Sequence, residues 1–266
     1  MTRGVVLWIV AIAVGLFAGV WQRRTGPSYP WRGRLMLGGS EAAVSLPRSH
    51  VTTSPARVAL PAPGAGMRGT LYWRRYPSGG SFAAIAMRAE GDTLAAALPV
   101  QAPAQMVEYY AELASGANET RIVPPTGRAV VLRWRSPIPS WILISHITVM
   151  MLALVLGARA GLAAALEGDR YRLLAVLTLA AIVLGGLVLG PATEQAAFGT
   201  WWTGIPSGRD VTDNKTLLAF VAWVAAVYAG GRRWRRAPAV VLLACVVMLA
   251  VYLIPHSVAG SRLQGY

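Results

Sequence analysis

Apolar runs alternate with polar segments along the chain and predict membrane-spanning helices. An α-helix of about 20 apolar residues crosses the ~30 Å hydrocarbon core of a bilayer. Five such runs occur, at residues 4–21, 139–158, 173–190, 217–230 and 238–255. The run at 217–230 is short and needs its flanks or a tilt to span. The pattern therefore predicts a membrane α-helical protein with five transmembrane helices.

The polar region between residues 22 and 137 has a different pattern, in which short alternating segments are separated by Pro, Gly and Ser. Gly91-Asp92 is typical of a tight hairpin turn, and residues 106–113 place every second side chain on one face. The predicted strands are residues 33–37, 42–46, 56–60, 68–76, 82–88, 93–98, 106–113 and 128–135. Seven or eight short strands at this spacing predict an inserted all-β sandwich of the Ig or fibronectin-III type.

These patterns divide the chain into three parts. Residues 1–21 form an N-terminal anchor helix, residues 22–137 an exported β-sandwich domain, and residues 138–266 a four-helix membrane domain with a polar outer loop at 191–216. A cleaved signal peptide is the alternative for the first part. The length of the apolar run and the lack of a small-x-small site before Gln22 favour the anchor.

Composition supports the membrane class. It argues against a nucleic-acid-binding protein and against a protein with disulfides or a thiolate metal site. The chain has 266 residues, 55% hydrophobic and 14% charged, with a mean hydropathy of +0.48. The formal charge of +14 comes from arginines that are scattered rather than clustered in a patch, which argues against nucleic-acid binding. Cys245 stands alone inside an apolar run, so we expect no disulfide and no thiolate metal site, but a small buried hydrophobe.

Arginines near two short connections predict the orientation in the membrane. Arg232, Arg233, Arg235 and Arg236 lie in one tight turn, and Arg159, Arg170 and Arg172 flank another. The positive-inside rule places both connections in the cytoplasm. We therefore expect a multi-pass protein of the bacterial inner membrane with a cytoplasmic N-terminus, and with the β domain, the loop 191–216 and the C-terminus in the periplasm.

This orientation predicts a cluster of polar and aromatic side chains at the outer face. The candidate binding residues are His146, Glu194, Trp201, Trp202, Asp210, Asp213, Asn214, Lys215 and His256. Structural alternatives stay open for several of them. The two tryptophans are also typical of an interfacial belt, and Thr212 or Asp213 would serve as the N-cap of the next helix. His146 would equally bond Ser145 or a backbone carbonyl.

Candidate chemistry at this face is limited. His146 and His256 are the histidine pair in the helical half, and such a pair can hold haem b iron, although their depths differ by roughly two turns. The loop is an alternative site for a quinone headgroup. We expect no other metal site, since nothing in the spacing brings His50 to these histidines. We expect no enzyme, with acid/base work by Glu194, Asp210, Asp213 and His256 as the open alternative.

Four motifs in the chain resemble those of an uncharacterised family of bacterial multi-pass membrane proteins. The motifs are QRRTGPSYP at 22–30, FGTWWTGIP at 198–206, DVTDNKT at 210–216 and YLIPHS at 252–257. The resemblance implies an N-terminal anchor, an exported β-rich domain and a C-terminal four-helix membrane region. It implies no activity.

Together these observations predict a non-enzymatic accessory or scaffold subunit of a membrane complex, with electron-transfer and photosynthetic complexes among the candidates. Membrane lipids and protein partners are the expected contacts. Glycine pairs suited to close helix packing support this hypothesis, at Gly15/Gly19, Gly157/Gly161 and Gly186/Gly190. A haem b or quinone-binding redox subunit is the first alternative. A transporter is the second, against which stands the lack of an inverted repeat.

Overall fold

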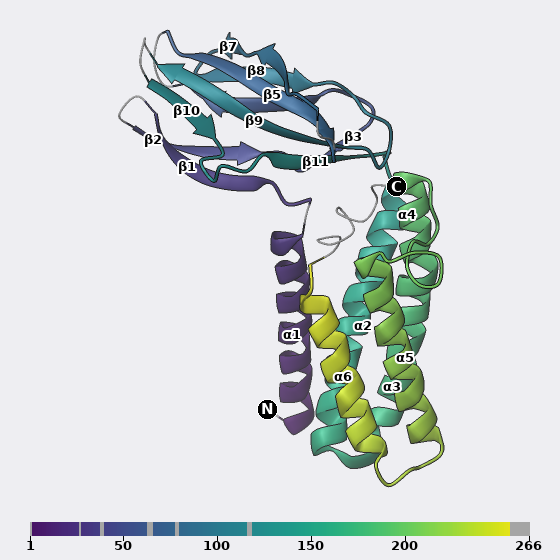
Figure 1. Cartoon of the computed structure of the whole chain (residues 1–266). Helices are drawn as coiled ribbons and strands as arrows, with labels where there is room; N and C mark the ends of the chain where they lie inside the picture. Colours follow the sequence, from purple (N-terminus) through teal and green to yellow (C-terminus); the bar gives the residue numbers. More distant parts are fainter. Residues whose placement is uncertain are drawn as a thin grey trace. The chain divides into compact units, whose positions relative to one another are not determined.

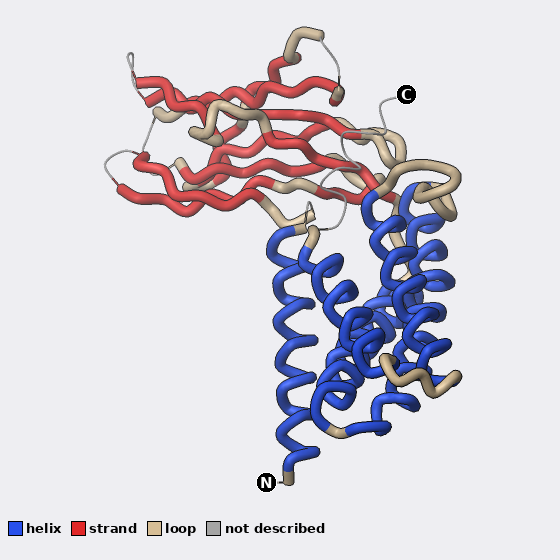
Figure 2. The backbone as a smooth tube through the Cα atoms, turned by 60° about the horizontal axis from the view of Figure 1, so that its bottom comes forward, coloured by secondary structure: helices blue, strands red, loops and turns tan. Residues whose placement is uncertain are grey.

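The computed structural model describes residues 2–26, 28–37, 40–62, 66–77, 80–115 and 119–255. The chain divides into two compact units, a helical one made of Met1–Gly26 with Ile138–Tyr266, and a β-rich one made of Pro27–Pro137. Figure 1 labels their elements, and Figure 2 separates the strands of the β unit from the helices by colour. Each unit is described by itself.

The described part of the β unit contains three sheets. Its strands are β1 (Trp31–Leu37), β2 (Ser40–Leu46), β3 (Ser49–Val51), β4 (Ala56–Pro61), β5 (Arg68–Tyr76), β6 (Ala83–Ala86), β7 (Arg88–Glu90), β8 (Thr93–Leu98), β9 (Met106–Ser115), β10 (Glu119–Val123) and β11 (Val130–Arg135). The largest sheet has the order β3-β11-β9-β5-β6, and β10 pairs with β9 beside it. The other sheets are β4-β8-β7 and the hairpin β1-β2. All pairs are antiparallel except β3 with β11.

The predicted strand pattern is largely confirmed, with one correction. The strands at 68–76 and 93–98 have the predicted bounds, and Gly91-Asp92 joins β7 to β8 with Gly91 at φ +59°. The single strand predicted at 82–88 is wrong, because the chain changes sheets there: β6 pairs with β5, and β7 pairs with β8. Met87 between them is buried, and its amide bonds Gly69 O.

One hydrophobic core serves all three sheets. As predicted, the alternate residues of β9 are buried, at Val107, Tyr109, Ala111 and Leu113. They pack with side chains from the β1-β2 hairpin and from the β4-β8-β7 sheet. The Tyr109 hydroxyl leaves this core to donate a bond to Pro47 O at 2.8 Å, so the buried phenol keeps a partner.

The described residues of the helical unit form five helical segments. They are α1 (Arg3–Thr25), α2 (Ser140–Leu166), a continuous segment made of η1 (Gly168–Arg170), α3 (Tyr171–Ile182), η2 (Val183–Leu189) and α4 (Gly190–Phe198), then α5 (Val211–Gly231) and α6 (Ala237–Leu253). Three of them are long and apolar enough to cross a membrane: α1, α2 and the segment Gly168–Phe198. α6 is a shorter apolar helix, and α5 has a polar first turn before its apolar part begins at Leu217.

Glycines let the helices approach closely, as the sequence predicts. A methyl group at Gly15 of α1 would lie 2.6 Å from Val155 Cγ2 of α2, and one at Gly161 of α2 would lie 2.7 Å from Cys245 Sγ of α6. Gly186 lies as closely against Thr216 of α5. Cys245 is therefore a small packing residue, as expected.

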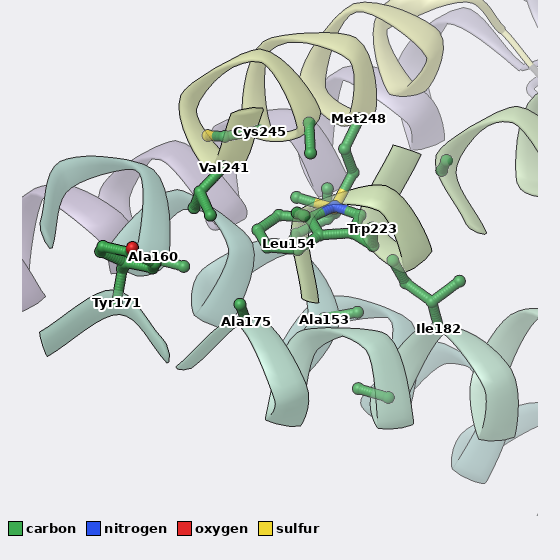
Figure 3. Packing of buried hydrophobic residues seen from close by; sticks show 14 of the residues in the cluster. Ala153, Leu154, Ala160, Tyr171, Ala175, Ile182, Trp223, Val241, Cys245 and Met248 are labelled. Atoms are coloured by element: carbon green, nitrogen blue, oxygen red, sulfur yellow. The ribbon is translucent and has the colours of Figure 1, made fainter. Parts of the chain in front are cut away.

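Trp223 fills the centre of the helical unit. It is fully buried, and Figure 3 shows its indole beside Leu154 of α2 and Met248 of α6. Small residues around it, such as Ala153 and Ala175, leave room for the ring. The core thus combines large aromatic residues, Trp223, Tyr171 and Tyr252, with many alanines, and it holds α2, α3, α5 and α6 together.

Candidate functional site

The segment predicted as an outer loop at 191–216 is partly helical, which corrects the prediction. The helix continues through α4 to Phe198, so Glu194 lies on a helix, and the connection to α5 spans only residues 199–210. Proline lacks an amide hydrogen and its ring collides with the preceding turn of an α-helix. Here Pro191 is the second residue of α4 and lies just after the π-helical segment η2, which ends at Leu189; the wider turn of a π-helix accommodates such an interruption.

Two residues at its ends set the bounds of the connection. Gly199 adopts φ +80° as the C-cap of α4, and its amide bonds Gln195 O at 2.9 Å. Asp210 is the N-cap of α5 and accepts bonds from the amides of Thr212 and Asp213 at 2.7 and 3.2 Å. The predicted N-cap at Thr212 or Asp213 is therefore wrong, because the aspartate two residues earlier takes that position.

Asp213 ties the first turn of α5 to the connection. Its Oδ2 accepts bonds from the amides of Thr203 and Gly204 at 2.7 and 3.0 Å, and lies 3.3 Å from the Thr203 hydroxyl. The side chain is buried. Asp213 is thus satisfied by groups of its own chain.

Glu194 joins this arrangement from α4. The Thr203 hydroxyl donates to Glu194 Oε1 at 2.8 Å while lying 3.3 Å from Asp213 Oδ2. One hydroxyl hydrogen serves only one of two acceptors. Both carboxyl groups therefore lie beside the Thr203 hydroxyl, which donates to only one of them at a time.

Asn214 and Trp202 complete the bonding of the connection. Asn214 Oδ1 accepts a bond from the Ile205 amide at 2.7 Å, and Trp202 Nε1 donates to Ile205 O at 3.0 Å. The backbone passes so close to α5 that a methyl group at Gly204 would lie 2.5 Å from Asp213 Cβ. Residues 203–205 are thereby fixed on the first turn of α5.

Two apolar side chains of the connection point away from this network. Trp201 is 61% exposed and Ile205 is 58% exposed. They differ from Trp202, whose indole nitrogen bonds within the connection. The pair of adjacent tryptophans therefore has two roles, one internal and one available to a membrane interface or a partner.

Lys215 reaches a different part of the helical unit. Its ammonium group donates to Ile254 O at 2.7 Å and lies 5.9 Å from the centre of the Tyr252 ring. From α1, Trp21 Nε1 donates to Leu253 O at 2.9 Å, and Gln22 Nε2 bonds Ile254 O at the same distance and also Tyr252 O. The carbonyls that end α6 are thus capped by side chains of α1 and α5.

His146 bonds a backbone carbonyl, which is one of the alternatives expected from the sequence. Its Nδ1 lies 2.9 Å from Gly185 O in η2. His256 lies outside the described residues, so the predicted histidine pair is not tested. Among the described residues, no three His, Cys, Asp or Glu side chains are grouped so that they could hold a metal ion.

The predicted cluster therefore falls into separate groups. Glu194, Asp210, Asp213, Asn214 and Trp202 are brought together around residues 203–205, whereas Lys215 faces the end of α6, His146 faces η2, and Trp201 is exposed.

A buried ion pair at the other end of the helical unit was not predicted. Arg159 Nη2 donates to Glu167 Oε2 at 2.6 Å, and the two side chains are only 7% and 6% exposed. The sequence holds a signal for it, because Arg159 is a charged residue close to the end of an apolar run. The positive-inside rule uses Arg159 as an orientation signal and does not predict its partner.

No protein-family model matches the chain, and no curated protein matches it. The resemblance expected from the four motifs stays a prediction.

Proposed function

We propose that the chain is a non-enzymatic accessory or scaffold subunit of a bacterial membrane protein complex. In this proposal α1, α2, the segment Gly168–Phe198, α5 and α6 all cross the inner membrane. The β unit is a sandwich of the Ig or fibronectin-III type in the periplasm. Together with the connection 199–210 it contacts partner subunits.

The distribution of arginine supports this orientation. The start of α1, the α2–α3 turn and the α5–α6 turn lie at one end of the helical unit, since Arg3 bonds Leu166 O and Gly230 lies against Tyr171. This end carries eight arginines and two acidic residues, namely Arg3, Arg159, Arg170, Arg172, Arg232, Arg233, Arg235 and Arg236 with Glu167 and Asp169. Such an excess favours a cytoplasmic location.

The observation that carries the scaffold proposal is the internal bonding of the polar connection. A reaction centre presents its acids, bases and donors to a substrate. Asp210 instead caps α5, Asp213 holds two backbone amides, and Asn214 holds a third. These groups build a rigid surface from which Trp201 and Ile205 project, and large exposed side chains on a rigid support are typical of protein interfaces.

Purification of the tagged chain in mild detergent tests the proposal. We expect a defined partner at near-equal amount, and we expect Trp201→Ala with Ile205→Ser to reduce its recovery. Trp234→Ala is the matched control, because Trp234 is 52% exposed on the opposite arginine-rich end. A chain that always purifies alone, or a partner lost equally in both variants, would contradict the scaffold role.

A redox subunit is the second candidate, and the bond of His146 favours it. Metal-ligating histidines commonly use one ring nitrogen to bond a backbone carbonyl and leave the other for the metal. His146 has this arrangement, with Nδ1 on Gly185 O. The carbonyl belongs to a π-helical segment, and such segments are frequent at functional sites.

The absorption spectrum of the purified chain tests the redox candidate. A Soret band that disappears in His146→Ala and persists in His50→Ala would establish His146 as a haem ligand. His50 is a suitable control because it packs against Trp134 within the β unit. A wild-type spectrum without the band, from cells supplied with haem, would eliminate the haem version.

A further inference from the structure

Arg159 is a buried cation with more donors than its surroundings satisfy. Its Nη2 bonds Glu167, but its Nε and Nη1 are buried without a partner in the described part of the chain. Buried polar groups are nearly always bonded, and an exception calls for an explanation such as a water molecule or an ion. The buried guanidinium of Arg159 therefore lacks hydrogen-bond acceptors for two of its nitrogen atoms.

The neighbouring residues add further positive charge. Arg3 Nη2 donates to Leu166 O at 2.8 Å, and Arg170 Nη1 lies 3.8 Å from Glu167 Oε1. Three arginines from two helices and a turn thus converge on the two-residue segment Leu166-Glu167. Glu167 is the one carboxylate that pairs with Arg159 and Arg170 among the described residues, so the group keeps a surplus of positive charge.

The position along the helices indicates what kind of anion reaches it. Arg159 lies seven residues before the end of α2, about 10 Å at 1.5 Å per residue. Its guanidinium stacks 5.5 Å from the centre of the Trp8 ring of α1. Tryptophan is enriched at the headgroup level of membranes, and a long arginine side chain extends toward that level from within the apolar layer.

We infer that Arg3, Arg159 and Arg170, beside Trp8, form a binding site for the phosphate group of an anionic phospholipid. Guanidinium groups are well suited to phosphate oxygens, and such a ligand would supply acceptors to Arg159 while its acyl chains lie along α1 and α2. These two helices pack against each other, with Gly15 of α1 against Val155 of α2 and Gly19 against Met151. This site is separate from the connection 199–210 and does not depend on the scaffold proposal.

Native mass spectrometry of the full chain in mild detergent tests this inference. We expect wild-type protein to retain added phosphatidylglycerol in preference to phosphatidylcholine. Arg159→Lys keeps the charge but removes the Nε and Nη1 donors, and Arg3→Gln removes an exposed partner with little effect on the fold. Each change should weaken phosphatidylglycerol binding about tenfold or more, since one hydrogen bond to a charged group is worth about 1.5–3 kcal/mol.

The matched control is Arg235→Gln, which removes one exposed charge from the same end of the helical unit. It should change binding by no more than about twofold, because surface charges contribute little individually. Equal losses in Arg235→Gln and Arg3→Gln, or no preference for phosphatidylglycerol in wild-type protein, would overturn the inference. Inorganic phosphate is the second arm. Displacement of the lipid by millimolar inorganic phosphate would reassign the site to a soluble anion.

Discussion

The two ends of the helical unit differ in how fully their buried charged groups are hydrogen-bonded. At the connection 199–210, the Asp213 carboxylate receives two backbone amides and lies beside a hydroxyl. At the arginine-rich end, one nitrogen of Arg159 bonds the Glu167 carboxylate. Its other two nitrogens, Nε and Nη1, are buried without an acceptor in the described part of the chain. The end with the dense polar motif therefore has charged groups that are hydrogen-bonded within the chain. At the other end, the sequence shows only a single charged residue beside an apolar run, and that residue is a buried cation without enough hydrogen-bond acceptors.

This difference distinguishes polar groups that support the fold from polar groups that are suited to bind a ligand. Polar groups that are fully bonded within the chain contribute rigidity, and removing one of them should affect stability. Buried donors without partners are already costly, so a ligand that satisfies them gains affinity. Substitutions that break each arrangement in turn measure how far the two ends differ.

Glu167→Gln should have the largest effect on stability. It removes the one carboxylate that Arg159 contacts among the described residues and leaves a buried guanidinium without this counter-charge. Breaking a buried ion pair in this way costs about 3–5 kcal/mol. The free energy of unfolding, from SDS titration of the detergent-solubilised chain, is the measurement.

Glu90→Gln is the control for that prediction. Glu90 pairs with Arg57 in the β unit, where the two side chains are 53% and 59% exposed, and exposed pairs contribute about 0–1 kcal/mol. A Glu167→Gln protein as stable as Glu90→Gln would mean that water or lipid already compensates Arg159.

Asp213→Ala should follow in size. It leaves the amides of Thr203 and Gly204 without their acceptor, at a cost on the order of 3 kcal/mol for two part-buried donors. Asp210→Ala removes only the N-cap of α5 and should cost about 1 kcal/mol. The same SDS titration compares the two variants, and equal losses would show that Asp213 does not hold the connection.

The sequence predicts the β unit well because its signals are local. Alternation in residues 106–113 and the turn at Gly91-Asp92 are set by neighbouring residues, and both are confirmed. The change of sheets at Met87 has no local signal in the sequence. The chain pairs with β5 before this residue and with β8 after it. For the same reason the short strands β3 and β10 were not predicted.

At the candidate site, the sequence predicts the residues but not their partners. Glu194, Asp213 and Asn214 are recognisable as unusual polar residues beside apolar runs, yet their bonds to residues 203–205 depend on how the connection folds back over α5. The continuation of the helix past Pro191 depends on the π-helical turn before it, and the apolar pattern of residues 183–189 does not distinguish a π-helix from an α-helix.

Gly204→Ala should have a smaller effect than Asp213→Ala. The added methyl group would lie 2.5 Å from Asp213 Cβ, so the connection must shift, at a cost of about 1–3 kcal/mol for an overpacked site. Gly231→Ala is the matched control, because nothing lies within 4 Å of a methyl group there. Equal stability of the two variants would indicate that the connection yields easily.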